Sequence, residues 1–253
     1  MRKACAALVA ALAMWPRLAD EARAANNAYA VDAADIGEAG SCKIESWLSS
    51  ATNTDFSFVA NPSCVVDPFS FKPVELGMQT NRARSEGEWG TTLAPKAKMN
   101  LIPTGIGKLG VSFYAAGAFD AFTGENLTVA AVIPATYRLS ETMRINVNGG
   151  WLWDRGIDRH YFTYGLGFDW KFTDTLQWTI EAFGQAGPAT DTPGTTRPRW
   201  QTGLRYRPNE IFSLDVILGH NITGESASWI TLGTTIRFPV EGGKPARERT
   251  GHL

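Results

Sequence analysis

The feature that most constrains this chain of 253 residues is a period of two in hydrophobicity. From Phe162 to Phe172 every second residue is aromatic or leucine, and the residues between them are Thr, Gly, Asp and Lys. The segment from Ser228 to Phe238 alternates in a similar way. Because successive side chains of a strand point to opposite faces, such segments are predicted to be strands with one apolar and one polar face.

Segments of this kind follow one another along most of the chain, and turn residues or loops separate them. The two weakest are the first two. The second is expected to end at the turn pair Asn61-Pro62, and Pro95 is expected to mark a bulge in the fourth. The predicted strands cover residues 43–50, 55–60, 74–82, 88–101, 108–120, 126–139, 143–154, 160–172, 176–187, 199–207, 211–221 and 228–238. The chain is therefore predicted to be all-β, with about twelve strands.

The polar faces of these strands distinguish a soluble sheet from a membrane sheet. Nearly every strand pairs its apolar face with a charged or glycine-rich face, which a soluble sandwich rarely does. An even strand number and connections that alternate in length are typical of bacterial outer-membrane barrels. The short turns are 140–142, 173–175 and 208–210, the longer loops are 121–125, 155–159, 188–198 and 222–227, and the connection at 102–107 is an exception. We therefore predict a transmembrane up-and-down antiparallel β-barrel over residues 42–238, with the short turns in the periplasm.

The N-terminal residues predict export. Arg2 and Lys3 precede an apolar run, and Ala22-Arg23-Ala24 fits the small-x-small cleavage rule, so residues 1–24 are predicted to be a signal peptide. The alternative is an Ala-rich N-terminal helix. Residues 25–41 lack both periodicities and are predicted to form a periplasmic N-terminal segment, and the polar residues 239–253 are predicted to form a disordered periplasmic tail. These features predict the outer membrane of a Gram-negative bacterium as the location.

Charge and cysteine content exclude other classes. Removal of residues 1–24 takes away four basic and two acidic residues, so the formal net charge changes from -1 to -3 and gives no general nucleic-acid-binding character. The remaining cysteines, Cys42 and Cys64, are predicted to form a disulfide at the base of the first hairpin, since the periplasm is oxidising. Metal binding is less favoured, because no histidine has ligand spacing to the cysteines, and no cofactor is predicted.

The two faces of the predicted strands carry different residue types. Aromatic residues on the apolar faces gather near the strand ends, as expected for two girdles where a barrel meets the lipid bilayer. The predicted girdle residues are Tyr137, Trp151, Trp153, Trp170, Trp178, Tyr206, Phe212 and Phe238. Charged residues on the polar faces are expected to point into the lumen, where they would favour anions or small polar solutes at a constriction. These residues are Glu75, Lys96, Lys98, Arg138, Arg144, Asp169, Lys171, Glu181, Arg205, Arg207, Asp215 and Arg237. A salt-bridged interior without a through-path is the alternative.

The closing strand and its terminal Phe238, after an export signal and many alternating strands, resemble the C-terminal insertion signal of outer-membrane barrels. The resemblance implies recognition by the barrel-assembly machinery and a porin-like fold. One departure is that Pro239 to Leu253 follow Phe238. Two shorter segments, Asn146 to Asp154 and Gly219 to Glu225, are similar to uncharacterised barrels grouped with the phenol-degradation-associated outer-membrane family. That similarity implies no site residues.

The sequence leaves three functions open. The leading hypothesis is a narrow passive channel or transporter for small solutes, without catalysis. The second is a structural or adhesive surface barrel without a through-pore, whose loop at 188–198 meets a partner outside the cell. The third is a hydrolase at the outer rim that uses His160 and His220. It is least favoured, because the chain has no Gly-x-Ser-x-Gly motif and residue types without a shared geometry prove little.

Overall fold

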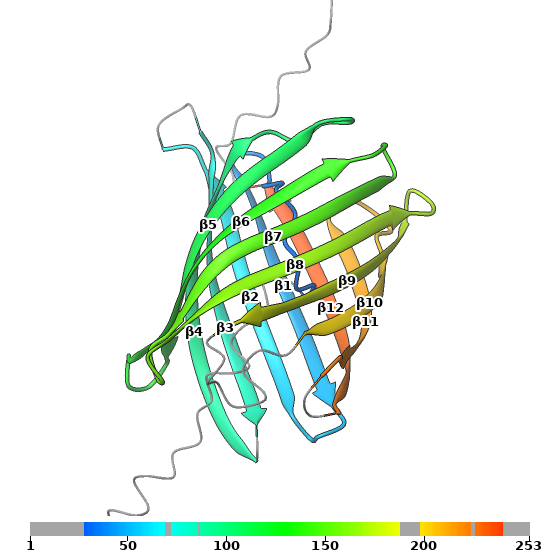
Figure 1. Ribbon diagram of the computed structural model, residues 1–253. Coiled ribbons are helices and arrows are strands. Elements are labelled where there is room, and N and C mark those ends of the chain that lie inside the picture. The colour runs from blue at the N-terminus through cyan, green and yellow to red at the C-terminus, as the bar shows by residue number, and fades with distance from the viewer. Residues whose placement is uncertain (1–27, 69–71, 86, 188–197, 224–225, 240–253) are drawn as a thin grey trace, which may run out of the picture.

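The computed structural model describes residues 28–68, 72–85, 87–187, 198–223 and 226–239. Within these ranges the chain forms one closed barrel in which every strand is antiparallel to its neighbours in the sequence (Figure 1). The last strand pairs with the first, from Ser41 opposite Pro239 to Ala51 opposite Trp229, and this pairing closes the ring. No helix long and apolar enough to cross a membrane is found in the described ranges.

Each predicted strand is present in the barrel, and most strand ends differ from the predicted ones by only a few residues. The strands are β1 (Ser41–Ala51), β2 (Phe56–Val66), β3 (Val74–Ser85), β4 (Glu88–Ile102), β5 (Leu109–Asp120), β6 (Asn126–Arg138), β7 (Met143–Asp154), β8 (Arg159–Lys171), β9 (Leu176–Ala186), β10 (Arg199–Tyr206), β11 (Phe212–Asn221) and β12 (Ser228–Pro239). The prediction of a twelve-stranded antiparallel barrel is therefore confirmed.

The alternation of side chains decides which residues face the lumen. In β8, Phe162 and Leu166 are 58% and 55% exposed on the outer surface, whereas Tyr161 and Asp169 on the other face are buried. The same alternation repeats in β11, where Leu214, Val216 and Leu218 are exposed and the residues between them are buried. The outer surface is therefore mostly apolar, and the polar face of each strand lines the interior.

The predicted turn at Asn61-Pro62 is wrong, because β2 runs through it to Val66. Pro62 lies opposite Ile44 of β1, inside a pairing that continues from Phe56 to Cys64. Asn-Pro favours a turn locally. In this chain the backbone hydrogen bonds between β2 and β1 keep the segment extended instead. The bulge expected at Pro95 is also misplaced: Pro95 lies opposite Met78, and the register of β4 with β5 shifts between Asn100 and Ile102 instead.

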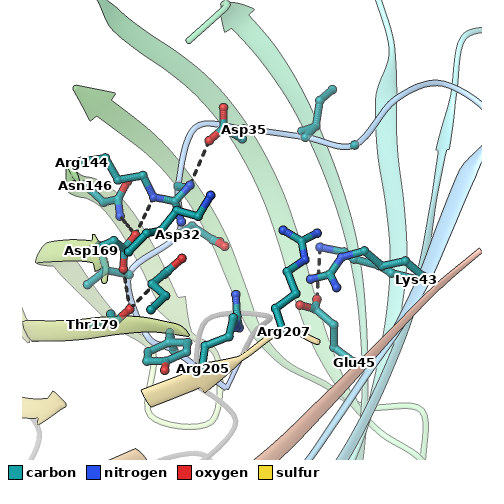
Figure 2. Close-up of a pocket in the computed structure, with 18 of the residues that line it drawn as sticks. Asp32, Asp35, Lys43, Glu45, Arg144, Asn146, Asp169, Thr179, Arg205 and Arg207 are labelled. Carbon is teal, nitrogen blue, oxygen red and sulfur yellow. Dashed lines mark hydrogen bonds and ion pairs between the residues drawn. The ribbon is translucent and has the colours of Figure 1, made fainter. Parts of the chain in front are cut away.

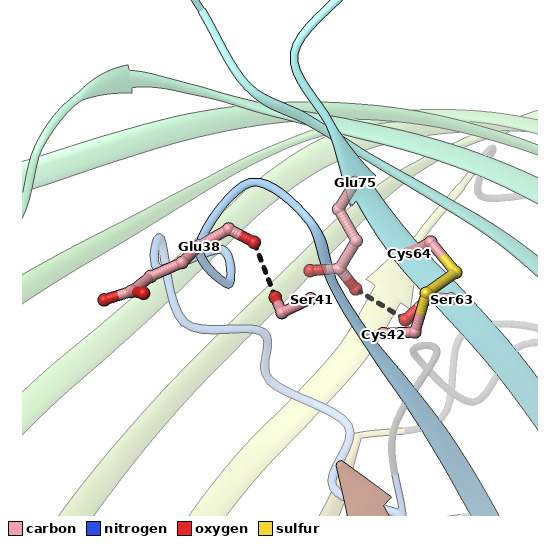
Figure 3. Close-up of a disulfide and its surroundings, with 6 residues drawn as sticks. All are labelled: Glu38, Ser41, Cys42, Ser63, Cys64 and Glu75. Carbon is pink, nitrogen blue, oxygen red and sulfur yellow. Dashed lines mark hydrogen bonds between the residues drawn. A yellow bond between two sulfur atoms is a disulfide. The ribbon is translucent and has the colours of Figure 1, made fainter. Parts of the chain in front are cut away.

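The disulfide between Cys42 and Cys64 joins β1 to β2 (Figure 3). The two residues lie directly opposite each other in the ladder, and their Cα atoms are 4.0 Å apart. The prediction of this pair is confirmed. Both cysteines lie inside their strands, whereas the sequence places them just outside, because β2 extends past the predicted turn.

The two ends of the barrel differ, and they are named here for use below. The short-turn rim is formed by the start of β1, the end of β12 and the turns at residues 139–142, 172–175 and 207–211. The loop rim is formed by the connections at the opposite end, including residues 121–125, 155–158, 222–223 and 226–227. The difference in length is limited to the later strands, since β3 ends at Ser85 and β4 begins at Glu88. The predicted loop at 188–197 and the tail at 240–253 lie outside the described residues.

The disulfide is expected to stabilise the start of the barrel. Replacing both Cys42 and Cys64 with Ser should lower the free energy of unfolding by about 3 kcal/mol, because the bond closes a loop with a sequence separation of 22. Urea unfolding of the folded protein in detergent, followed by tryptophan fluorescence, measures this difference. A reducing agent should lower the wild-type midpoint and leave the double variant unchanged. Equal midpoints for the wild type and the double variant would contradict the expectation.

Candidate functional site

Residues 28–40, which precede β1, are called the lumen segment below; residues 28–36 lie inside the barrel, and Gly37 to Ala39 are exposed (Figures 1 and 2). Tyr29, Asp32 and Ala34 are 6%, 1% and 0% exposed. The sequence predicts a periplasmic segment at 25–41, and the described part of it is instead enclosed by the strands. Its lack of periodicity is consistent with this position, because it is held by lumen side chains and not by a ladder.

One inward carboxylate binds the backbone of the lumen segment. Glu181 of β9 accepts hydrogen bonds from the amides of Ala30 and Val31, at 2.8 and 3.2 Å, and from the side-chain amide of Gln201, at 2.7 Å. The hydroxyl of Thr136 accepts a further bond from the amide of Ala34, at 2.8 Å. These side chains accept hydrogen bonds from backbone amides that have no strand partner. The segment is therefore buried without leaving these amides unpaired.

Two acidic side chains of the lumen segment form ion pairs with the barrel wall. Asp32 Oδ2 lies 2.7 Å from Lys96 Nζ, and both side chains are less than a tenth exposed. Asp35 Oδ2 lies 3.0 Å from Arg138 Nη2 and 3.2 Å from Arg144 Nη1 (Figure 2). The predicted inward cations of β4, β6 and β7 therefore meet their counter-charges on the chain's own N-terminal segment.

Lys98 of β4 binds the same segment without a carboxylate. Its ammonium donates to the backbone oxygens of Ala33 and Asp35, at 2.6 and 3.0 Å. Burial by itself would raise the pKa of the Asp32 carboxyl, but the ammonium groups of Lys96 and Lys98 outweigh it and lower that pKa to about 2. Asp32 is therefore ionised throughout the neutral and mildly acidic range.

Glycines of the wall make room for the apolar side chains of the segment. A Cβ atom at Gly165 of β8 would lie 2.9 Å from Val31, and one at Gly203 of β10 would lie 2.8 Å from the Tyr29 hydroxyl. The ring of Tyr29 also stacks with the guanidinium of Arg205, at 5.2 Å. The glycine-rich inner faces of β8 and β10 therefore fit this segment closely.

A cavity of about 480 Å³ lies between the lumen segment and the short-turn rim. All of the predicted constriction residues line it except Asp215. Asp215 is buried behind it and binds Arg205 through two bonds of 2.7 and 3.1 Å. The structure therefore brings the predicted charges together in one place, around a space of the size that small-molecule sites have.

The acidic groups of this cavity are engaged by neighbours. Asp169 of β8 accepts bonds from Arg144 Nε at 2.6 Å, Asn146 at 2.9 Å and the Thr179 hydroxyl at 2.6 Å (Figure 2). Lys43 lies 3.2 Å from both Glu45 and Glu75. Much of the lumen charge is thus internally neutralised, as the salt-bridged alternative expects.

Toward the loop rim, large side chains fill the interior. Trp47, Val59, Leu152, Tyr161 and Ile217 point inward from five strands and are at most 6% exposed. These five side chains are called the apolar layer below, and buried polar residues such as Asn81, Thr92 and Asn221 accompany them in the same half of the barrel. The level formed by the lumen segment is mostly ionic.

The predicted girdle residues all belong to the outward faces of their strands. Those nearest the short-turn rim are Tyr137, Trp170, Trp178, Tyr206, Phe212 and Phe238, and those nearest the loop rim are Trp151 and Trp153. Tyr206 is 48% exposed and Phe238 41%, so these rings are available to a surrounding bilayer.

The two histidines of the hydrolase hypothesis are not brought together. His160 stacks between Trp151 and Trp153 on the outer face, with ring centroids at 5.6 and 5.8 Å. His160 lies on β8, and His220 lies on β11, three strands further round the barrel. The Nδ1 atom of His220 is 2.8 Å from the Ser228 hydroxyl. Neither has an ion pair or hydrogen bond with a carboxylate among the described residues, so no catalytic triad forms there. The described ranges also contain no group of three or more potential metal ligands.

Sequence reasoning missed the lumen segment and the apolar layer. The available signal for the first was the pair Asp32 and Asp35, which precedes a barrel with inward lysines and arginines. The signal for the apolar layer was the presence of Trp47 and Leu152 at positions that the alternation of their strands places on the inward face. Neither pattern has the periodicity of a regular element, so pattern analysis gives them no weight.

Comparisons with known proteins show the same fold at low sequence identity. The COG4313 outer membrane channel from Pseudomonas putida F1 matches with a TM-score of 0.61 and 11% identity, over 81% of this chain and 97% of that one. The NanC porin matches with a TM-score of 0.60 and 5% identity, over 76% and 98%. The KdgM porin in complex with disordered oligogalacturonate matches with a TM-score of 0.56 and 9% identity, over 78% and 99%.

At the level of sequence, a family model described as Uncharacterised conserved protein UCP029691 matches residues 11–238. No match was found among curated proteins. The similarity of two segments to the phenol-degradation-associated family stays a prediction, since the matching family model is a different one.

Loss of the Asp32 carboxylate should loosen the lumen segment. In Asp32→Asn, the ion pair with Lys96 is lost, which should weaken docking by about 2 kcal/mol and increase exposure of the segment roughly 30-fold. Placing Cys at Ala34, which is fully buried, allows this exposure to be measured as the rate of maleimide labelling at pH 7. Asp67→Asn, at an exposed position outside the cavity, is the matched control and should leave the rate unchanged. Equal rates in the Asp32 and Asp67 variants would contradict the role of the ion pair.

The ion pair between Asp32 and Lys96 should persist in mild acid. Docking lowers the pKa of Asp32 to about 2 from an ordinary value of 3.8, so its contribution is fully present above about pH 4 and is lost as the pH falls through 2. Hydrogen exchange of a peptide covering residues 28–40 should therefore differ between wild type and Asp32→Asn by the same factor at pH 7 and pH 4.5. A difference that disappears by pH 4.5 would show that another group controls docking.

Proposed function

The chain belongs to the family described as Uncharacterised conserved protein UCP029691, and we propose that it acts as an outer-membrane channel for small polar solutes. The proposed channel is passive, needs no cofactor, and is closed in this conformation by the lumen segment. Opening requires residues 28–40 to leave their place in the barrel.

The observation that carries this proposal is the way in which the lumen segment is held. Its contacts are ion pairs from Asp32 and Asp35 and hydrogen bonds to Glu181 and Lys98. Ionic contacts beside a cavity can be replaced by contacts with water or with a charged solute, whereas the packing of an apolar core cannot. A segment held in this way is suited to a closure that opens.

The outer surface supports a membrane location. Exposed apolar side chains occur on every part of the ring, for example Leu48, Leu101, Leu166 and Leu232. A soluble monomer rarely exposes a contiguous apolar band of this kind, whereas a barrel in a bilayer requires it. We infer the outer membrane of a Gram-negative bacterium, export by a signal peptide at 1–24 and assembly through β12. Of these, residues 1–24 lie outside the described part of the chain.

The similar structures favour a channel over other barrel functions. The COG4313 protein is described as an outer membrane channel, and NanC and KdgM are described as porins. KdgM is described in complex with a disordered oligogalacturonate. For the present chain we propose small polar solutes, because about 480 Å³ is available between the lumen segment and the short-turn rim.

A structural barrel without a through-pore is the second candidate. The observation that favours it is the apolar layer near the loop rim, where Tyr161 and Ile217 are 1% and 0% exposed. If this layer does not open, removal of the lumen segment would enlarge the cavity but would not open a path through the barrel.

Removal of residues 28–40 should separate the two candidates. In planar lipid bilayers, wild-type protein should give rare and brief openings, and the deletion variant should give sustained conductance steps with an open probability at least tenfold higher. A correctly folded and inserted deletion variant that stays silent would support the structural barrel and refute the channel.

A locked variant supplies the opposite test. Val31→Cys with Gly167→Cys should form a disulfide, because a Cβ atom at Gly167 would lie 3.4 Å from the Cβ atom of Val31, close to the separation in a disulfide. This variant should stay closed until reduced, whereas each single cysteine variant should behave like the wild type. Openings of unchanged frequency in the oxidised double variant would show that the lumen segment does not control the pore.

A further inference from the structure

Most basic residues around the cavity have a partner supplied by the chain, but those nearest the short-turn rim do not. Lys43, Lys96, Arg138, Arg144 and Arg205 each form an ion pair with a carboxylate. Lys98 donates to two backbone oxygens. Arg207, Arg237 and Lys171 line the same cavity, and no ion pair joins any of them to a carboxylate within the described ranges.

The positions of these three cations follow from the strand ends. Lys171 is the last residue of β8, Arg207 directly follows β10, and Arg237 lies near the end of β12. Backbone bonds hold all three in place, from the Arg207 amide to Thr175 and the Arg237 amide to Ile211, both at 2.7 Å, and from the Lys171 amide to Thr142 at 2.9 Å. Figure 2 shows Arg207 pointing into the open space between the Asp169 cluster and Lys43.

Like charges face one another at this end of the cavity. The guanidinium of Arg237 lies within electrostatic range of those of Arg207 and Arg205 and of the carboxylates of Glu45 and Asp215. Within the described ranges its side chain forms a 3.4 Å contact with the Ser213 hydroxyl. Asp215 is paired with Arg205, so neither Arg207 nor Arg237 has a carboxylate at ion-pair distance among the described residues. Glu45 is nearby but is held by Lys43, at 3.2 Å.

Lys171 and Arg207 are exposed and Arg237 is half-buried, so an anion can reach all three cations from the cavity that they line. A lumen with low-dielectric walls concentrates their field, so a small anion gains more there than it would on an open surface. Two guanidinium groups can each offer paired N–H donors to a carboxylate or phosphate. A cavity of about 480 Å³ has room for a small organic acid beside the lumen segment.

We propose that Arg207, Arg237 and Lys171 form a binding site for a small anionic solute that carries a carboxylate or phosphate group. The site rests on the proposed channel function and specifies its solute class. It lies at the short-turn rim, on the side of the lumen segment where Asp35 pairs with Arg144. Arg144 and the three cations line the same cavity, so a solute held there shares this space with the ion pair between Asp35 and Arg144.

Calorimetric titration of the folded full-length protein in detergent tests this site, with inorganic phosphate and succinate as separate probes. At low ionic strength at least one probe should bind saturably, and 0.5 M sodium chloride should weaken that binding because the contacts are ionic. The double variant Arg207→Gln with Arg237→Gln should weaken it at least tenfold. The proposal is overturned if neither probe binds saturably to the wild type.

The matched control is Lys72→Gln with Lys108→Gln. It removes the same charge from exposed positions at the same end of the barrel, and neither residue lines the cavity. Binding that is retained in this control and lost in the arginine variant supports the site. Equal weakening in both double variants would indicate a general charge effect and overturn it.

The outcome is independent of the channel test, because binding is measured without a membrane. Conductance by the variant lacking residues 28–40 together with no saturable binding would leave the channel standing and remove the anion site. Binding that depends on Arg207 and Arg237, in a barrel that never conducts, would leave the site standing and remove the channel.

Discussion

Closure of the strand ring is the constraint on which the rest of this structure depends. In a bilayer every backbone N–H and C=O needs a partner within the protein, and only a ring without free edges supplies one for each strand. The pairing of β1 with β12 completes that ring, and the disulfide to β2 secures the strand on which closure depends. The weakest predicted strands are therefore the ones that carry both a covalent bond and the closing ladder.

A closed ring also encloses the polar faces, and their charges must then be neutralised inside. Arg205 with Asp215 and Lys43 with Glu75 do this between strands. The remaining cations on β4, β6 and β7 depend on Asp32 and Asp35 of the lumen segment, which enters from the same end as β1. The same ion pairs of the lumen segment therefore neutralise cations of the barrel wall and close the lumen.

The apolar layer and the lumen segment differ in what could open them. The layer around Tyr161 and Ile217 is held by packing, whereas the lumen segment is held by charge. Anions compete for charge contacts, and the unpaired cations at the short-turn rim lie where such an anion would arrive. The proposed channel and the proposed anion site both depend on the contacts of the lumen segment and on the cations at the short-turn rim.

The sequence by itself determined the strand count, the face of each strand and the cysteine pair, because alternation along one strand is a local property that needs no knowledge of its neighbours. It also placed charges such as Lys96, Arg144 and Asp169 on inward faces. It misjudged Pro62 and the segment before β1, since a ladder and a buried ion pair depend on residues far away in the chain. Only the tertiary structure decided which charges meet, that Asp32 and Asp35 occupy the lumen, and that Arg207 and Arg237 form no ion pair with a carboxylate of the described residues. Such pairings depend on ring closure, which brings residues more than sixty positions apart within hydrogen-bond distance.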